Sequence, residues 1–498
     1  TLQLRGAGSD QVLVLLDGVA LNSPLTGEVD LATVDLEALE RIVVLPGARS
    51  SRYGPRALGG VVLLESRATR ENGGQLTVGG GAWGGREVSG TASWDPAGAW
   101  SLSTGGRWSR ADGDFTYMVP EFRGGGEAHR ENAEYRRAGG HLRLARTGEG
   151  ITGALRLHLT DIRRGSPGAI AQPSLTGEQH HRRQGVALRT RAGDEETGGF
   201  LLLAFHRHRG EYQDSAPPFG KAYHQVARVT QQETGLEGWR TRGGLTLRAG
   251  GDLRSLRVRS DALRPPSVDL WQGGAWARAE LALALSPEMG LGLQAGLRAD
   301  GHELVEGTTL SPSLQANLRR GRSTLGVAYR SGFSPPGLAD LFFQEGVLVQ
   351  PNPELRPERA DGDVSLTLGQ GVASGPVDLQ LQLALYRGDI DDMILWFPDF
   401  RFVWSPRNIH VAREGLDLTS SAELALFGHT HSLSAHASWS RVRYRGGVLE
   451  GQVAYRPEFS AGARARIHLG FGEATARLSH VGRRRAVAGS DLNALASY

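Results

Sequence analysis

The stretch "DLQLQLAL" at Asp378–Leu385 carries a leucine at every second position, with a polar or small residue between neighbouring leucines. Successive side chains of a β-strand point to opposite faces, so this spacing puts four leucines on one face and polar or small groups on the other. The same alternation recurs at Leu155–Leu159, Leu245–Leu247 and Leu291–Leu297. The sequence therefore predicts a mainly β fold whose strands each have one apolar and one polar face.

The alternating segments are longer than the strands of a typical soluble sandwich. Leu416–Phe427 is one such segment, and after a turn at Gly428 the pattern resumes at Ser432–Arg443. Strands of about 10 residues suit a tilted crossing of a bilayer. Short turns such as Asp95–Ala99 alternate with long links such as Gly113–Asn132. We predict a transmembrane antiparallel β-barrel of about 19 or 20 strands, counted from Gly74, whose lumen is open or plugged.

Composition narrows the class of protein. The chain has 498 residues, 39% hydrophobic and 22% charged, which excludes a disordered polymer. It contains no cysteine, which excludes disulfides, thiolate metal sites and cysteine nucleophiles. The net charge is only +3 and the arginines are scattered, so nucleic acid is not an expected partner. The apolar runs are too short for a membrane-spanning helix, which needs about 18 residues.

Tryptophans tend to fall near the ends of the expected strands, where a membrane-interface girdle places them. Ordinary core tryptophans are the alternative. The residues concerned are Trp83, Trp94, Trp100, Trp108, Trp396 and Trp404.

Residues 1–70 have a different pattern. Val12–Leu16 and Ile42–Leu45 are short apolar runs, typical of buried strands. Leu31–Glu40 has helical spacing, and Asp30 is positioned to cap its first turn. This predicts a small α+β unit ahead of the barrel, of the size that a lumen plug requires.

Several motifs occur in the order found in one known family, and together they cover nearly the whole chain. They are "LRG" at Leu4–Gly6, "VLVLLDGVALN" at Val12–Asn22, "LERIVVLPGARSSRYGPRALGGVV" at Leu39–Val62, "GFSPPGLADLFF" at Gly332–Phe343 and "NPELRPERAD" at Asn352–Asp361. The chain resembles the TonB-dependent outer-membrane receptors, and within them the branch that includes the cobalamin receptors.

The resemblance implies a barrel of the 22-strand type and a division into two domains. Residues 1–70 would be the C-terminal part of the plug domain, and residues 71–498 the barrel without its last two or three strands. The final "DLNALASY", Asp491–Tyr498, resembles the start of a late barrel strand. The energy-coupling segment would precede Thr1, so the sequence is expected to be truncated at both ends.

The resemblance also implies a function. The protein would be a monomeric, non-enzymatic receptor of the Gram-negative outer membrane, embedded in its lipid. It would bind a corrinoid or a ferric siderophore and admit it when TonB, with its inner-membrane energising complex, rearranges the plug. A passive channel or porin is the alternative. A membrane-barrel enzyme is a third class, but no catalytic grouping supports it.

The family's ligand-contacting plug loops correspond to two segments of this chain. The residues are Ser23, Pro24, Leu25 and Thr26 in the first loop, and Arg49, Ser50, Ser51, Arg52 and Tyr53 in the second. Arg5 and Arg41 are expected to contact the barrel. The family usually has an arginine where this chain has Pro46-Gly47-Ala48, so the usual ion-pair lock of the plug is in doubt unless Arg49 or Arg41 substitutes.

Other patterns are weaker. The histidines at His180-His181, His206, His208, His429 and His431 could bind metal, but lumen or loop positions explain them more simply. "DIDD" at Asp389–Asp392 could bind calcium or form a solvated turn, and Asp112 and Asp114 are further calcium candidates. Gly79–Gly84 fits a dinucleotide motif formally, but no helix is expected after it. We therefore predict no metal site and no cofactor, with calcium in the outer loops left open.

Overall fold

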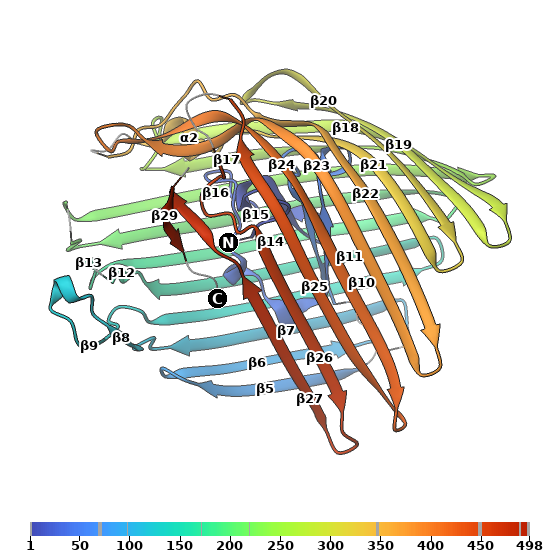
Figure 1. Ribbon diagram of the computed structural model, residues 1–498, viewed down its shortest axis with the longest axis horizontal. Helices are drawn as coiled ribbons and strands as arrows, with labels where there is room; N and C mark the ends of the chain where they lie inside the picture. The colour runs from blue at the N-terminus through green and yellow to red at the C-terminus, as the bar shows by residue number, and fades with distance from the viewer. Residues whose placement is uncertain are drawn as a thin grey trace.

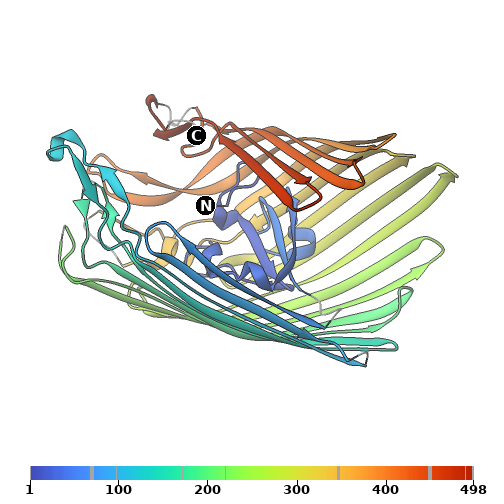
Figure 2. The ribbon, with the colours of Figure 1, turned by 90° about the horizontal axis from the view of Figure 1, so that it is seen from below.

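A computed structural model describes residues 2–67, 72–96, 98–170, 172–218, 220–344, 348–446, 451–487 and 490–495. Nineteen strands of this part form one barrel, and a small four-stranded sheet lies inside it (Figures 1 and 2). Barrel strands that follow one another along the chain pair antiparallel. The prediction of a mainly β barrel with about 19 or 20 strands is confirmed.

The barrel strands follow the sequence order around the ring. They are β5 (Gly73–Gly81), β6 (Gly85–Trp94), β7 (Trp100–Ala111), β10 (Tyr135–Gly148), β11 (Ile151–Gly165), β14 (Glu178–Gly193), β15 (Thr197–Asp214), β16 (Tyr223–Arg242), β17 (Leu245–Ser260), β18 (Ser267–Ser286), β19 (Met289–His302), β20 (Val305–Arg320), β21 (Ser323–Ser334), β22 (Glu358–Ser374), β23 (Val377–Pro398), β24 (Trp404–Leu426), β25 (His429–Tyr444), β26 (Phe459–His468) and β27 (Glu473–Val481). The ring closes where β27 meets β5.

The two ends of the barrel differ in their connections. At one end the strands are joined by short turns such as residues 149–150 and 243–244, and at the other by longer links such as residues 112–134 and 335–357. We call these the turn end and the link end. Small elements occupy the links: β8 (Thr116–Met118), β9 (Glu127–His129), β12 (Gly168–Ala169), β13 (Gln172–Pro173), the 3-10 turn Glu121–Arg123 and helix α2 (Leu338–Phe342).

The plug is built on the sheet β2-β1-β4-β3. Its strands are β1 (Val12–Leu16), β2 (Val19–Ala20), β3 (Leu39–Pro46) and β4 (Gly60–Ser66), and its helical segments are α1 (Ser50–Tyr53) and the 3-10 turns Ser9–Gln11, Leu31–Thr33 and Leu36–Ala38. The central strand β1 is nearly all buried because it lies between β2 and β4. Figure 2 shows the plug, in dark blue, enclosed by the barrel strands.

Two expectations for the plug are wrong. Leu31–Glu40 is not one helix, because Asp30 and Asp35 both adopt extended backbone and start separate 3-10 turns. Asp30 nevertheless caps the first turn, accepting a hydrogen bond from the Ala32 N–H at 3.0 Å. Ile42–Leu45 is a strand but not a buried one: Ile42 is 52% exposed because β3 is the edge of the sheet.

The chain passes from plug to barrel between Ser66 and Gly73. The predicted domain border at residue 70 falls on residues 68–71, outside the described residues. At the other end of the chain, the expected barrel strand at Asp491–Tyr498 is not observed in that role. Ser490–Leu495 (β29) instead pairs with Arg484–Val487 (β28) in a separate two-stranded sheet, and residues 496–498 are not described.

Candidate functional site

The first predicted ligand loop lies at the link end, but the link between β21 and β22 covers part of it. The Pro24 carbonyl accepts a hydrogen bond from the Leu338 N–H at 3.1 Å, and the Leu25 carbonyl accepts one from Ala339 at 2.9 Å. Leu25 also packs into an apolar cluster with the fully buried Leu338. Thr26 stays exposed and Ser23 is half-buried. We call residues 335–343 the apex link, because they hold this tip of the plug.

The second predicted ligand segment is not a free loop. Ser50–Tyr53 is helix α1, which packs against the barrel strands β19, β20 and β21. Ser50 is fully buried, and its hydroxyl accepts a hydrogen bond from the Phe333 N–H at 3.2 Å. The Arg49 side chain is also largely enclosed, and burial lowers the pKa of its guanidinium. Ser51 is half-buried in the same helix. Sequence reasoning missed this packing because the barrel partner lies far away in the chain.

Arg52 and Tyr53 line a cavity of about 240 Å³ between plug and barrel. The Arg52 guanidinium donates to Glu237 at 2.6 Å and lies 4.2 Å from the ring centroid of Trp276. Glu237 lies six residues from the turn that joins β16 to β17. These two predicted ligand residues therefore face the turn-end half of the lumen rather than the link-end mouth.

The departure at Pro46-Gly47-Ala48 has a specific structural consequence. Asp363 of β22 accepts a hydrogen bond from the Ala48 backbone N–H at 2.8 Å. The same carboxylate lies 3.5 Å from the Arg413 guanidinium of β24, and both side chains are buried. Here a backbone donor of the plug takes a position where the family resemblance led us to expect an arginine.

The two predicted plug-to-barrel arginines have different partners. Arg5 reaches the wall: its Nε donates to Asp417 of β24 at 3.1 Å, and its guanidinium lies 4.5 Å from the ring centroid of Tyr386. Arg41 forms its ion pair with Glu65, across the β3–β4 pair of the plug sheet, and its side chain is 66% exposed. The structure therefore gives Arg41 a partner inside the plug and not the expected one in the barrel.

The motif at Asn352–Asp361 supplies another buried contact with the plug. Glu358, 1% exposed, accepts hydrogen bonds from the Gln11 side chain at 2.7 Å and from the Ile394 N–H at 2.8 Å. Asp10 and Arg56 of the plug are close enough to Glu358 to interact with it electrostatically. Burial raises the pKa of Asp10 and lowers that of Arg56, so both charges are held away from water.

A third contact is centred on Arg298 of β19, which is fully buried. Its guanidinium bridges two barrel carboxylates, Asp252 at 2.6 Å and Asp300 at 2.7 Å. Gly54, just after α1, comes so close that an added Cβ would lie 2.9 Å from an Arg298 nitrogen. The sequence offered no signal for this group, since its members are distributed over β17, β19 and the plug segment after α1.

The lumen-facing histidines form ring pairs rather than a metal cage. His181 and His208 stack with centroids 5.7 Å apart, and His158 lies 5.1 Å from His206. Within the described ranges, no three His, Cys, Asp or Glu side chains are grouped so that they could hold a metal ion. Of the other weak motifs, "DIDD" is not a solvated turn: it lies in β23, where Asp389, Asp391 and Asp392 pair with Arg445, His410 and Arg356.

The remaining weak motifs are ordinary structural features. Gly79–Gly84 ends β5 and enters a turn into strand β6. Asp112 pairs with Arg110 at 2.9 Å. His429 and His431 lie against His468. In the part of the chain that the structure describes, no helix is long and apolar enough to cross a membrane.

Comparison with known families places this architecture. The family model described as "TonB-dependent Receptor Plug Domain" matches residues 1–61, and the one described as "TonB dependent receptor-like, beta-barrel" matches residues 49–498. The chain belongs to the TonB-dependent receptors. The barrels of this family are outer-membrane proteins, and its members are receptors and transporters.

Individual relatives of this TonB-dependent receptor are distant. It is 24% identical over 441 residues to the vitamin B12 transporter BtuB of Vibrio vulnificus, covering 86% of this chain and 66% of that protein. The chain thus spans about two thirds of the length of the curated relatives that it matches. Among solved structures, the siderophore receptor PirA of Acinetobacter baumannii superposes with a TM-score of 0.75 at 16% identity, over 100% of this chain and 84% of PirA.

A second solved structure, a mutant of the ferric enterobactin receptor PfeA of Pseudomonas aeruginosa, superposes with a TM-score of 0.76 at 17% identity, over 100% of this chain and 82% of PfeA. At these identities the structural matches establish the fold. Together with the family models they confirm the resemblance that the plug and barrel motifs indicated.

Proposed function

We propose that this chain is the ligand-binding and gating part of an active, TonB-dependent importer in the outer membrane, and that it acts as a monomer. The observation that carries the proposal is the plug itself, a folded sheet held inside the barrel by buried polar contacts. Arg5–Asp417, Ala48–Asp363 and Gln11–Glu358 all cross from plug to wall. A passive porin would not need a plug fixed in its lumen.

The buried contacts also favour a gate that opens under an applied force. Breaking a buried ion pair costs about 3–5 kcal/mol when one partner loses its counter-charge. Several such contacts would keep the plug in place on the timescale of diffusion. External work, which TonB and its inner-membrane energising complex supply in this family, would then be needed to move it.

The ligand class is a corrinoid or a ferric siderophore. The sequence relative named above transports vitamin B12, and the two structural relatives are siderophore receptors. In this chain the link-end half of the wall between β11 and β16 carries lumen-facing polar and aromatic side chains. They are Arg164, His181, His208, Tyr212 and Tyr223. Cationic and flat aromatic groups suit both a corrinoid with its phosphate and an anionic iron chelate.

The plug residues that would meet the ligand first are those of the first predicted ligand loop. We keep Ser23, Pro24, Leu25 and Thr26 as proposed ligand contacts, with Thr26 the most accessible. The second predicted segment would contact the ligand only after the plug has moved, because α1 is packed on the barrel wall. Its residues are Arg49, Ser50, Ser51, Arg52 and Tyr53.

The experiment is uptake of radiolabelled cyanocobalamin by cells that carry the full-length receptor, with and without a protonophore. A TonB-dependent importer accumulates the ligand only while the membrane is energised. Equal entry in both conditions would indicate a passive channel. If the receptor shows no cyanocobalamin binding, the same assay with ferric enterobactin tests the iron-chelate alternative.

A further inference from the structure

The lipid-facing side of the barrel can be identified from the alternation of its strands. On β15, Leu202 and Ala204 are buried against the plug residue Val19, so even-numbered side chains point inward. Their odd-numbered neighbours point outward, and Leu203 is 41% exposed. On β17, Val258 is fully buried in the cluster around Leu338, so its odd-numbered residues are the outward ones.

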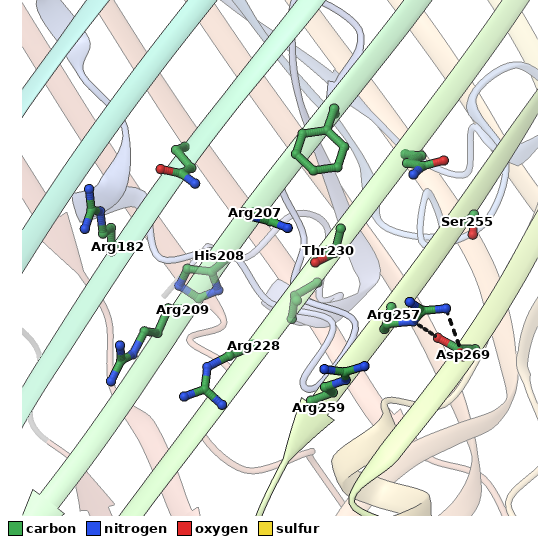
Figure 3. A pocket seen from close by; sticks show the side chains of 14 residues that line it. Arg182, Arg207, His208, Arg209, Arg228, Thr230, Ser255, Arg257, Arg259 and Asp269 are labelled. Carbon is green, nitrogen blue, oxygen red and sulfur yellow. Dashed lines mark hydrogen bonds and ion pairs between the residues drawn. The ribbon is translucent and has the colours of Figure 1, made fainter.

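Four arginines form a row across the outward face of four successive strands. The recorded registers put Arg182 of β14 opposite Arg209 of β15, Arg209 opposite Arg228 of β16, and Arg228 opposite Arg259 of β17. Neighbouring strands are about 4.8 Å apart, so each guanidinium has a like charge beside it. Figure 3 shows the four side chains on their strands, and we call them the arginine row.

The arginine row is poorly neutralised by the protein. Arg209 pairs with Glu211 at 2.7 Å, whereas Arg182, Arg228 and Arg259 have no ion pair with any described residue. Asp161, the cross-strand neighbour of Arg182, lies 3.0 Å from His180 and 4.0 Å from Arg163 instead. Two more outward arginines flank the row, Arg207 and Arg257, and only Arg257 has a carboxylate partner, Asp269. Like charges directly opposite each other destabilise a sheet, so this arrangement calls for an external anion.

The far wall of the same barrel shows the balanced alternative. There the outward row runs from Arg387 of β23 to Glu414 of β24 and on to Arg441 of β25, so both arginines lie beside the one carboxylate of Glu414 and no two arginines are opposite each other. Both rows lie on exposed faces of long strands. The excess positive charge is therefore a property of one side of the barrel, not of barrel arginines in general.

The position of the arginine row selects the kind of anion. On β17 the outward-facing residues are apolar or small from the turn end as far as Leu253. Ser255, Arg257 and Arg259 are the next outward-facing residues toward the link end. From Leu245 to Ser255 a tilted strand rises about 25 Å, which is the height of the apolar band of an outer-membrane barrel. The arginines thus begin at the level of the lipid headgroups on the link-end side.

We propose that the arginine row binds the phosphate groups of a phosphorylated lipid in the outer leaflet, with the acyl chains on the apolar surface around Leu203, Phe205 and Leu253. The side chains of the row and its neighbours line a groove of about 900 Å³. Arginine forks pair with phosphate oxygens in two parallel hydrogen bonds. The proposal rests on the outer-membrane location that the proposed function includes, but it requires neither TonB nor the transported ligand.

The test is lipid titration of the purified full-length receptor by native mass spectrometry. The probes are a diphosphorylated glucosamine lipid, its dephosphorylated form, phosphatidylcholine and inorganic phosphate. We expect tight binding of the phosphorylated lipid alone. Arg228→Gln should weaken it about fivefold, since each basic residue near an anionic surface contributes about that factor. The four factors multiply in the quadruple R182Q/R209Q/R228Q/R259Q variant, which should therefore bind roughly 600-fold more weakly.

Arg441→Gln is the matched control, because it removes one outward arginine but leaves Arg387 opposite Glu414. It should change lipid affinity less than twofold. An equal loss in Arg441→Gln and Arg228→Gln, or equal binding of the dephosphorylated lipid, would overturn the proposal. If inorganic phosphate competed for the arginine row as strongly as the phosphorylated lipid does, the proposal would also be overturned, since the site would then bind a soluble anion.

A second readout separates lipid binding from a structural role. In lipid-free detergent, Arg228→Gln should raise the urea midpoint of barrel unfolding by relieving repulsion from Arg209 and Arg259. A lower midpoint would show that the row stabilises the barrel by itself, contrary to the proposal. Because uptake is not measured, failure here leaves the transport function standing, and failure of uptake leaves lipid binding standing.

Discussion

The carboxylate of Asp363 in the barrel accepts a hydrogen bond from the backbone N–H of Ala48 in the plug, with oxygen and nitrogen 2.8 Å apart. Pro46 and Gly47 precede this donor, and Gly47 has a positive φ of 80°. A Cβ on Gly47 would lie only 2.8 Å from the same carboxylate. The plug backbone can therefore approach Asp363 closely, where a longer side chain would otherwise have to make the contact.

Replacing Asp363 should loosen the plug. Asp363→Asn removes the charge beside buried Arg413, which we expect to cost about 3–5 kcal/mol. Asp363→Ala also removes the acceptor for Ala48 and should cost about 1 kcal/mol more. The measurement is the urea concentration at which the full-length receptor in a planar bilayer begins to conduct ions. Asp378→Asn is the control, since its pair with Arg322 is exposed and worth about 1 kcal/mol or less.

Gly54 should tolerate no side chain. Its φ is 79°, and a Cβ there would lie 2.9 Å from the Arg298 guanidinium, which its two carboxylates hold in place. We expect Gly54→Ala to destabilise the plug by about 2 kcal/mol or more, combining backbone strain with the displaced arginine. The same conductance assay measures it. Gly428→Ala, at a φ of 75° in an open turn, carries the backbone strain alone and should leave the plug unaffected.

The barrel was predictable because its signal is local. Period-2 alternation in segments such as Asp378–Leu385 indicates strands with one apolar and one polar face, and short turns such as Asp95–Ala99 separate the strands in the sequence itself. The plug strand Val12–Leu16 was visible as an apolar run, and the run Ile42–Leu45 marked strand β3. The prediction of one helix over Leu31–Glu40 was wrong because Asp30 and Asp35 each begin a separate 3-10 turn. Helical spacing of the apolar residues alone does not reveal such a break.

The site was less predictable because its contacts join distant parts of the chain. Ser50 meets Phe333, Arg52 meets Glu237 and Ala48 meets Asp363, and no pattern around Arg49–Tyr53 encodes these partners. The arginine row depends on register: Arg182 and Arg228 become neighbours of Arg209 only once three strands are aligned. The motif at Asn352–Asp361 is the exception. This segment is recognisable in the sequence as a motif, and it contains Glu358, which contacts Gln11 of the plug.

A disulfide between the plug tip and the apex link should block uptake reversibly. The chain has no cysteine, so Leu25→Cys with Ala339→Cys introduces a single pair. The Leu25 carbonyl and Ala339 N–H are 2.9 Å apart, which brings the two backbones within reach of a disulfide. We expect import to be lost in the oxidised variant and restored when the disulfide is reduced. Import by the fully oxidised variant would show that the plug tip need not leave the apex link.

The apex link should respond to pH through Asp340. Burial raises the pKa of this carboxyl, against the opposing effect of hydrogen bonds from Trp396 at 2.9 Å and Gly337 at 3.0 Å. A raised native pKa means that the folded state holds the proton more tightly than the unfolded chain. Protonated Asp340 therefore adds to the free energy of unfolding. This contribution is complete below the ordinary pKa of about 3.9 and is lost as the pH rises through the pKa of Asp340 in the folded protein.

Asp340→Asn should remove this dependence. The urea midpoint of the wild type, relative to that of the variant, should be higher at pH 4 than at pH 7, because only the wild type gains stability on protonation. Asp399→Asn is the control: turn N–H groups hydrogen-bond the Asp399 carboxylate and lower its pKa, so its contribution has the opposite sign. A parallel pH response in wild type and Asp340→Asn would mean that another buried carboxyl, such as Asp10, dominates the titration.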